Sequence, residues 1–264
     1  MREWLCVAGS LAWTLIWLLQ PDTSLVGQVV RASAVLLTGA FLAMTVYRPS
    51  ADLSRALLAT GAAALALASW TGVFGISWAA VSHGFERELW ASNRTFVDQL
   101  SAAGTAAGGA GPLLDQLSAA ASATAALLPA LLVLAALAGL RLGWSWHHRI
   151  AVKPLGEPPA RFQAFAFSDQ LVWLLVAGLA LTLVPQAPGW RAAAQNLLAL
   201  GGALYAIRGL AVFSAGSGRL SRAGCALLTL VAMFLLPFVV GGLTLLGVAD
   251  TWLDFRRRRA TPAT

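Results

Sequence analysis

The chain has 264 residues, of which 58% are hydrophobic and only 11% are charged, and its mean hydropathy is +0.73. A soluble domain needs many more charged residues on its surface, so this composition excludes the soluble globular class and predicts an integral membrane protein. The net charge of +7 is explained by basic loops on the cytoplasmic side of a membrane. We therefore expect the lipid bilayer, and no nucleic acid, as a partner.

Seven apolar segments follow one another, and each is long enough to cross a hydrocarbon layer of roughly 30 Å as a helix. They lie at about residues 4–20, 24–47, 55–81, 123–146, 168–185, 192–214 and 224–249. The sequence predicts an all-α polytopic transmembrane bundle with about seven spans, within a range of six to eight. Residues 1–264 are expected to form a single integral membrane domain. Pro237 at the centre of the seventh segment predicts a kink or a break there.

One long polar insertion, residues 82–122, separates the third and fourth segments. Its first half places four apolar side chains, Phe85, Leu89, Phe96 and Leu100, on one face of a helix. This pattern is typical of an amphipathic helix that lies on the membrane or covers the bundle, and equally of a solvated connector. The motif VDQLSAA at 97–103 recurs as LDQLSAA at 114–120. The repeat predicts two short helices in a hairpin, unless it is a chance echo in an alanine-rich stretch.

Basic loops near residues 48–55, 147–161 and 217–222 indicate the orientation of the chain. The positive-inside rule places them in the cytoplasm of a bacterial cell with the protein in its inner membrane, so the N-terminus is expected to be cytoplasmic. Seven full spans would then place the basic tail, residues 255–264, outside the cell. Either the seventh segment re-enters at Pro237 and returns, or another segment does not span, or the tail is an exception.

The tail begins directly after an apolar segment that contains Asp250 and Asp254. Its four arginines are predicted to be a cytoplasmic topology signal or an anchor to anionic lipid headgroups; they are Arg256, Arg257, Arg258 and Arg259. The two carboxylates lie four residues apart on one helical face and can pair with these arginines. We expect them to have this structural role rather than to form a carboxylate dyad for acid–base catalysis.

Local signals mark several segment ends. Ser168 has the character of a helix N-cap, with Asp169 in the first turn where the helix dipole favours a carboxylate. Tryptophans near the predicted ends are expected to be interfacial anchors; they are Trp4, Trp78, Trp144, Trp146 and Trp190. His147 and His148 are adjacent in sequence, so on a helix they point about 100° apart and do not easily share one metal.

The sequence contains no glycine-rich phosphate loop with a lysine, and no HExxH, GxSxG or CxxC motif. We therefore predict no catalytic residues, no metal, no cofactor and no enzymatic activity. Polar residues inside the spans are the candidates for substrate binding; they are Arg31, Gln195, Asn196 and Arg208. Facing a polar cavity, they would hold an acidic or amide-bearing small molecule. The alternatives are snorkelling of the arginines to the headgroups and hydrogen bonds from the amides to neighbouring helices.

Stretches of the C-terminal half resemble a known family. They are PALLVLAALAGLRL at 129–142, FSDQLVWLLVAGLALTLVP at 167–185, AAQNLLALGGALYAIRGLAVFSA at 193–215 and LGVADTWLDFRRR at 246–258. Together with Asn196, Gly209 and the Gly247, Asp250 and Trp252 of the ending, they resemble the YybS-like family of predicted bacterial multi-pass membrane proteins, whose function is unknown. The resemblance covers about residues 125–258.

That family is distantly similar to the S components of energy-coupling-factor transporters, which pass vitamins or metal ions to a coupling protein with ATPase subunits. This implies small-molecule binding or transport as the membrane component of a larger complex, with Ala8 and Ala12 on a coupling face of the first helix. The same broad group includes the cell-shape protein MreD. That relation implies the alternative function, a non-transporting scaffold that organises cell-envelope proteins.

Overall fold

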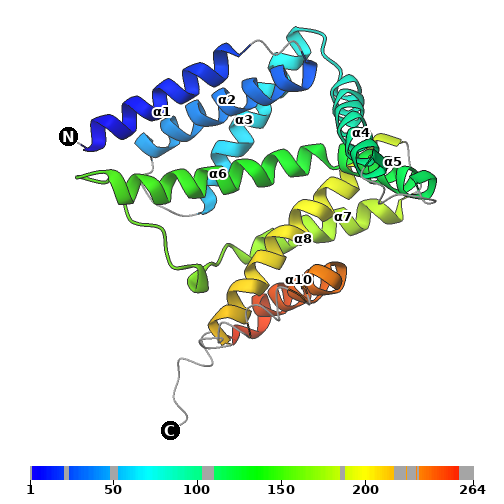
Figure 1. Ribbon diagram of the computed structural model, residues 1–264. Coiled ribbons are helices and arrows are strands. Elements are labelled where there is room, and N and C mark those ends of the chain that lie inside the picture. The colour runs from blue at the N-terminus through cyan, green and yellow to red at the C-terminus, as the bar shows by residue number, and fades with distance from the viewer. Residues whose placement is uncertain are drawn as a thin grey trace. The chain divides into compact units, whose positions relative to one another are not determined.

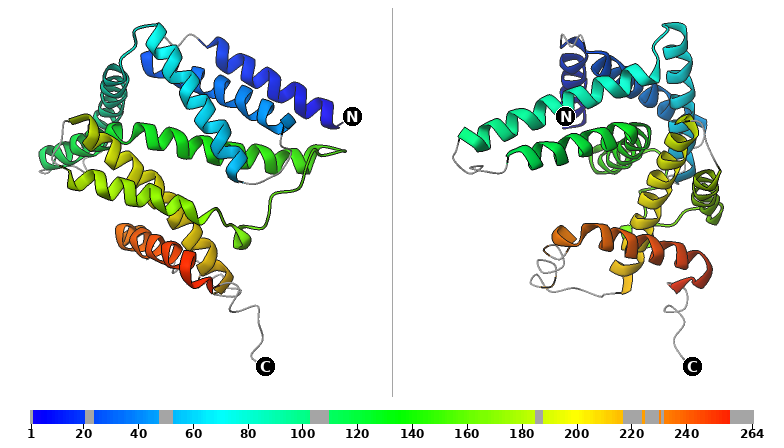
Figure 2. Two further views of the ribbon diagram at one scale, coloured as in Figure 1. Left: turned by 180° about the vertical axis from the view of Figure 1, so that it is seen from behind. Right: turned by 90° about the vertical axis from the view of Figure 1, so that its right-hand side faces the viewer.

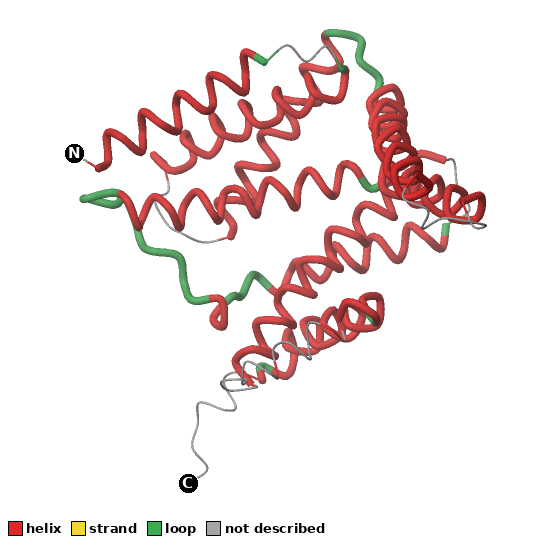
Figure 3. The backbone as a smooth tube through the Cα atoms, in the orientation of Figure 1, coloured by secondary structure: helices red, strands yellow, loops and turns green. Residues whose placement is uncertain are grey.

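The computed structural model describes residues 2–20, 24–47, 53–102, 110–184, 188–216, 224, 230 and 232–255. Within these residues the regular structure is helical (Figures 1 and 3), which confirms the predicted all-α membrane fold. The chain forms two compact units, Met1–Pro159 and Ala160–Thr264, hereafter unit 1 and unit 2. The single membrane domain over the whole chain stays a prediction.

Unit 1 contains the helices that precede the proline-rich loop. They are α1 (Arg2–Leu19), α2 (Leu25–Tyr47), α3 (Leu53–Val73), α4 (Trp78–Ala102), α5 (Ala110–Ala126) and α6 (Leu128–Ile150). α2 packs against α3 and α4, and α6 contacts α1, α2 and α3. The core of this unit joins Val29 of α2, Val81 of α4 and Leu128 of α6, all of which are buried.

Two helix boundaries in unit 1 differ from the predicted segments for local backbone reasons. α3 ends at Val73, earlier than the predicted residue 81, because Gly75 adopts a φ of 65°, which helices do not accommodate. Ser77 then accepts a hydrogen bond from the backbone N–H of Ala80 and starts α4. α6 begins at Leu128, several residues after the predicted 123, with a proline in its first turn that ends the preceding helix.

The polar insertion forms the predicted helical hairpin. α4 and α5 contact each other and carry the two copies of the repeated motif (Figure 2). The buried side of α4 contains Val81 and Val97, whereas Phe96, which was expected on the apolar face, is exposed. Since α4 also packs against α2, the insertion is part of unit 1 and not a separate connector.

A buried arginine in unit 1 is enclosed by aromatic rings. The guanidinium carbon of Arg55 lies 4.1 Å from the ring centroid of Trp144 and 4.9 Å from that of Phe41. Trp144 also donates a hydrogen bond of 3.1 Å from Nε1 to the backbone oxygen of Glu157, and its ring contacts both His147 and His148. The ring of Trp144 is therefore buried beside a cation, whereas that of Trp146 is exposed. The role of both as interfacial anchors stays a prediction.

We expect Trp144→Phe to lower the free energy of unfolding by about 1–2 kcal/mol, because it weakens the cation–π contact and removes the hydrogen bond to Glu157. Trp146→Phe is the matched control and should have little effect, since Trp146 is exposed. The measurement is the thermal unfolding midpoint of each variant in one detergent. Equal midpoints for the two variants would contradict the role of Trp144.

Unit 2 contains two short 3₁₀ turns and three described α-helices. They are η1 (Phe162–Ala164), η2 (Asp169–Leu171), α7 (Val172–Leu183), α8 (Pro188–Gly216) and α10 (Leu236–Leu253). α8 is the centre of the unit because it packs against both α7 and α10 (Figure 1). Pro237 lies in the first turn of α10, so the predicted break in the seventh segment is present as a helix start.

The contacts of α8 fix the direction of its neighbours. Gly178 of α7 lies against Leu198, and Leu175 lies against Gly201. The residue with the higher number on α7 therefore contacts the one with the lower number on α8, so α7 is antiparallel to α8. On the other side, Thr244 donates a hydrogen bond to the backbone oxygen of Gly202, and Gly247 lies against Tyr205. Here the residue numbers of the contacting pairs rise together on both helices, so α10 runs parallel to α8.

Five helices among the described residues are long and apolar enough to cross a membrane; they are α2, α3, α6, α8 and α10. The apolar helix that begins at Asp169 ends at Leu183, and its length of roughly 22 Å is short of a full hydrocarbon layer. Large apolar side chains on these helices are exposed, including Leu42, Leu65 and Leu245. This exposure fits side chains that face lipid rather than water.

Candidate functional site

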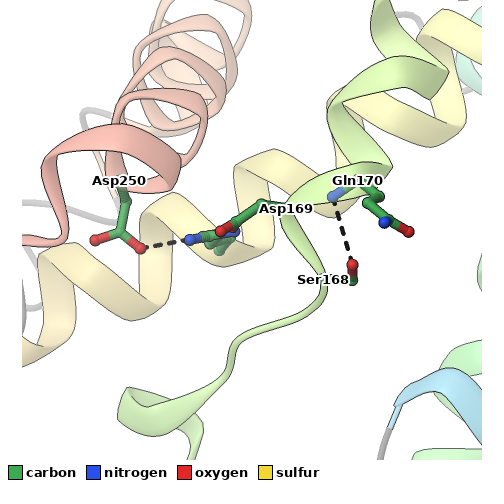
Figure 4. Close-up of polar contacts among 5 residues, drawn as sticks. Ser168, Asp169, Gln170 and Asp250 are labelled. Carbon is green, nitrogen blue, oxygen red and sulfur yellow. Dashed lines mark hydrogen bonds and ion pairs between the residues drawn. The ribbon is translucent and has the colours of Figure 1, made fainter.

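One arginine in the middle helix of unit 2 lies between two carboxylates. Nε of Arg208 donates a hydrogen bond of 3.0 Å to Oδ2 of Asp250 on α10, and Nη1 donates one of 3.0 Å to Oδ1 of Asp169 at the start of η2. Figure 4 shows the two carboxylates converging from different elements. The side chains of Arg208 and Asp250 are 6% and 0% exposed, whereas that of Asp169 is 64% exposed. We call these three residues the Arg208 cluster.

Local sequence features place each member of the cluster. Ser168 is the N-cap of η2 and accepts a hydrogen bond from the backbone N–H of Gln170 (Figure 4), as predicted. This cap holds Asp169 in the first turn, where the helix dipole stabilises its charge. On the other side, Gly209 and Gly247 bring the backbones of α8 and α10 into direct contact. That close approach lets the short side chain of Asp250 reach Arg208.

Aromatic and hydroxyl groups surround the ion pairs. The guanidinium carbon of Arg208 lies 5.3 Å from the ring centroid of Phe167, which packs edge-on against Tyr205 at 5.1 Å. The hydroxyl groups of Tyr205 and Thr251 are buried near each other. Because these groups exclude water from one side of the cluster, the attraction between Arg208 and Asp250 is screened much less than at a surface.

The Arg208 cluster links three elements, η2, α8 and α10, through ion pairs. Two different guanidinium nitrogens bind two different carboxylates, a geometry that the single ammonium group of a lysine does not reproduce. A buried pair of this kind destabilises a protein strongly when one partner is removed. The positive charge of Arg208 is matched by two carboxylates, so the cluster holds η2, which leads into α7, together with α8 and α10.

A cavity of about 330 Å³ lies beyond the cluster at the C-terminal end of α8. Val212 and Ala215, which line it, follow Arg208 by four and seven residues and therefore share its face of the helix. Other lining residues are Arg161, Gln163 and Ala164 from the segment that contains η1, Gly216 of α8, and Phe255 after α10. The volume falls at the lower end of the roughly 300–1,000 Å³ of small-molecule pockets.

The predicted substrate-binding residues belong to both units and have different local partners. Arg31, in unit 1, donates a hydrogen bond of 2.6 Å to the backbone oxygen of Gln20, and its guanidinium carbon lies 5.9 Å from the ring centroid of Trp17. Asn196 donates to the backbone oxygen of Ala192 on its own helix, and Gln195 is exposed. Arg208 follows Asn196 by twelve positions on α8, so roughly 18 Å lies between them along the helix axis. Of these four residues only Arg208 belongs to the cluster, and none of them lines the cavity.

Sequence reasoning missed the partners of Arg208. Asp250 was expected to pair with the arginines of the tail, but its partner on the described helices is Arg208, 42 positions earlier. Arg256, Arg257, Arg258 and Arg259 lie outside the described residues, so their role stays a prediction. The sequence did contain one signal for this pairing, because charged residues are rare in the spans. Ionisable residues buried among transmembrane helices usually pair with one another. Arg161 and Gln163 gave no such signal, because they belong to a polar loop.

Among the described residues, no group of three or more histidines, cysteines and carboxylates lies close enough together to hold a metal ion. Residues 7–251 match the model of a family described as "Predicted membrane protein (DUF2232)". No curated protein matches the chain, and no solved structure matches it.

Proposed function

Since the chain belongs to the DUF2232 family of predicted membrane proteins, we propose that it binds a small molecule as the membrane component of a larger complex. The observation that carries this proposal is the cavity of about 330 Å³ in unit 2, which combines apolar walls with the side chains of Arg161 and Gln163. Mostly apolar walls with a few polar groups are typical of ligand sites. The proposal includes a bacterial inner membrane as its location and a binding role rather than catalysis.

The Arg208 cluster supports the proposal because it fixes the walls of the cavity. Val212 and Ala215 belong to α8, and Phe255 follows α10 directly. The hydrogen bond between Arg208 and Asp250 joins these two helices one or two turns before the cavity. A site whose walls are held in register loses less conformational freedom on binding, and its affinity is higher for that reason.

The role in a larger complex is supported by the resemblance to the S components of energy-coupling-factor transporters. Those proteins commonly use an Ala-x-x-x-Ala face of their first helix to contact a coupling protein. Ala8 and Ala12 of α1 have this spacing, and both are exposed. In this proposal a coupling protein with ATPase subunits contacts α1, and the molecule bound in unit 2 is its cargo.

The test is mild purification of the tagged full-length protein from its own membranes, followed by mass spectrometry of bound small molecules and co-purifying proteins. Ala215→Trp places a large ring in the cavity from an exposed position, and we expect it to lower the recovered ligand at least about tenfold, or 1.4 kcal/mol. Phe213→Trp is the matched control, because Phe213 is on the same helix and does not line the cavity. It should leave the ligand in place.

Recovery of a coupling protein with ATPase subunits would support the transport role. If the wild-type protein carries no ligand, and only cell-envelope proteins co-purify, the binding proposal is wrong and the scaffold alternative takes its place. Equal ligand recovery from the Ala215→Trp and Phe213→Trp variants would show that the ligand lies elsewhere.

A further inference from the structure

Two histidines in the last turn of α6 bind the backbone of the loop that follows this helix. Nε2 of His147 accepts a hydrogen bond of 3.0 Å from the backbone N–H of Leu155. Nδ1 of His148 lies 3.0 Å from the backbone oxygen of Trp144, and its Nε2 lies 3.4 Å from that of Gly156. Both rings are half-buried, so protons reach them from the solvent.

The sequence places these groups on one face of the helix and provides a glycine in the loop. His147 and His148 follow Trp144 by three and four residues, so the three side chains share a face of α6. Gly156 adopts a φ of 68°, a conformation that residues with a side chain rarely adopt. Trp144 adds a hydrogen bond of 3.1 Å from Nε1 to the backbone oxygen of Glu157. The end of α6 therefore binds three consecutive residues of the loop.

The bonding partners require different proton positions on the two rings. A backbone N–H only donates, so Nε2 of His147 accepts the bond from Leu155 only while this nitrogen carries no proton. Both ring nitrogens of His148 face carbonyl oxygens, which only accept, so both bonds form only when both nitrogens are protonated. The set of hydrogen bonds is complete when His147 is neutral and His148 is an imidazolium cation.

A second proton on the pair opposes the bound loop in two ways. On Nε2 of His147 it replaces an acceptor by a donor, which then faces the N–H of Leu155. It also creates a second cation beside the first, since the two ring centroids are 5.3 Å apart. Arg55 of α3 adds positive charge nearby, because its guanidinium lies over the ring of Trp144, which contacts both histidines. The other charged residues of α1, α2, α6 and the loop are mostly basic; they are Arg2, Glu3, Arg31, Arg141, Arg149, Lys153 and Glu157.

We propose that His147 and His148 form a pH-sensitive latch for the loop that connects α6 to unit 2. The latch is closed while His147 is neutral and His148 is protonated, and it opens when acidification also protonates His147. The bond between Trp144 and Glu157 contains no titratable atom, so the loop stays attached at that point. Since unit 2 begins at Ala160, directly after the latched residues, the latch makes the freedom of the chain between its two units depend on pH.

Hydrogen exchange of the Leu155 amide tests the latch in the detergent-purified full-length protein. The side chain of Leu155 is 63% exposed, so burial contributes little to the protection of its N–H. Three of the residues 151–160 are prolines, so few other amides in this peptide exchange. We expect protection, corrected for the chemical exchange rate, to fall about fivefold between about pH 7.5 and about pH 5, because one hydrogen bond is lost as a histidine titrates. Unchanged protection over this range overturns the proposal.

Variants of His147 distinguish titration of this ring from a general effect of acid. His147→Gln has an amide oxygen that accepts the bond from Leu155 at any pH, so it should keep the protection and lose its pH dependence. His147→Phe has no acceptor, and its Leu155 amide should exchange about fivefold faster already near pH 7.5. His83→Gln is the matched control, because His83 is the third histidine of the chain and is exposed on α4. A pH dependence that persists in His147→Gln would assign the change to another group and overturn the latch.

Nitrogen NMR of the isotope-labelled histidine rings tests the proton positions directly. While the Leu155 amide is protected, Nε2 of His147 should have the chemical shift of an unprotonated nitrogen, and both nitrogens of His148 those of protonated ones. The single variants at positions 83, 147 and 148 assign the signals, since the chain has only three histidines. A protonated Nε2 of His147, or a neutral His148, in this state would contradict the proposed latch.

Discussion

The Asp250→Ala variant is expected to lose about 3–5 kcal/mol of unfolding free energy, one of the two largest effects we predict for a single substitution in this protein. Asp250 is fully buried, and its carboxylate accepts a hydrogen bond from Arg208, which is also buried. Removing the carboxylate leaves a cation without its buried partner, and the cost of burying that charge is no longer offset. The measurement is the denaturant midpoint of the purified protein in mixed micelles.

Two further variants show whether the cost arises from the uncompensated charge. Asp169→Ala removes the other carboxylate, whose side chain is 64% exposed, and solvent screening should limit the loss to about 1 kcal/mol. The double variant Arg208→Met with Asp250→Leu removes both buried charges and should recover most of the stability. A double variant as unstable as Asp250→Ala would indicate that the site requires the ion pair for a reason other than charge compensation.

The same double variant separates stability from function. In our proposal the Arg208 cluster holds the helices that form the cavity, and Arg161 rather than Arg208 contacts the ligand. A stable double variant should therefore retain the ligand that co-purifies with the wild-type protein. If it folds normally and loses the ligand, Arg208 or Asp250 takes part in binding directly. The prediction from sequence that Arg208 lines a substrate site would then gain direct support.

Hydropathy and capping signals predict the helices of this chain well, because they depend on residues that are close in sequence. The apolar run at 192–214 lies within α8, Ser168 caps the turn before α7, and Pro237 starts α10. The third segment was predicted eight residues too long, since its apolar character continues past Gly75 although the backbone there leaves the helix. The backbone conformation of Gly75 ends α3, and a hydropathy pattern contains no information about backbone conformation.

The site depends on which helix faces meet, and the sequence contains little information about that. Asp169 and Asp250 reach Arg208 from positions 39 and 42 residues away. Each carboxylate has a simpler local explanation, as a dipole-stabilised first-turn residue or as a partner of the nearby tail. Trp144 is similar: a tryptophan near a segment end suggests the interface, and only the fold places Arg55 against its ring. These pairings follow from helix directions that a hydropathy pattern leaves open.

The parallel packing of α8 and α10 leads to the second large effect, which concerns Gly209 and Gly247. A Cβ at Gly209 would overlap the backbone oxygen of Leu243, and one at Gly247 would overlap that of Tyr205. Backbone atoms cannot rotate away as side chains do, so Gly209→Val or Gly247→Val must push the two helices apart. We expect a loss of about 3 kcal/mol or more, at the upper end of the cost of overpacking.

Glycines elsewhere on the same two helices provide controls in which substitution should raise stability rather than lower it. A Cβ at Gly202 of α8 or at Gly242 of α10 would meet no atom within 4 Å. Gly202→Ala and Gly242→Ala should therefore raise stability by up to about 1 kcal/mol, because alanine favours the helix more than glycine does. The smaller substitution Gly209→Ala should still destabilise. The measurement is the denaturant midpoint of each variant. If the Gly209→Ala protein is as stable as the Gly202→Ala protein, α8 and α10 do not touch at Gly209. In that case the parallel packing of α8 and α10 would lose its main physical support.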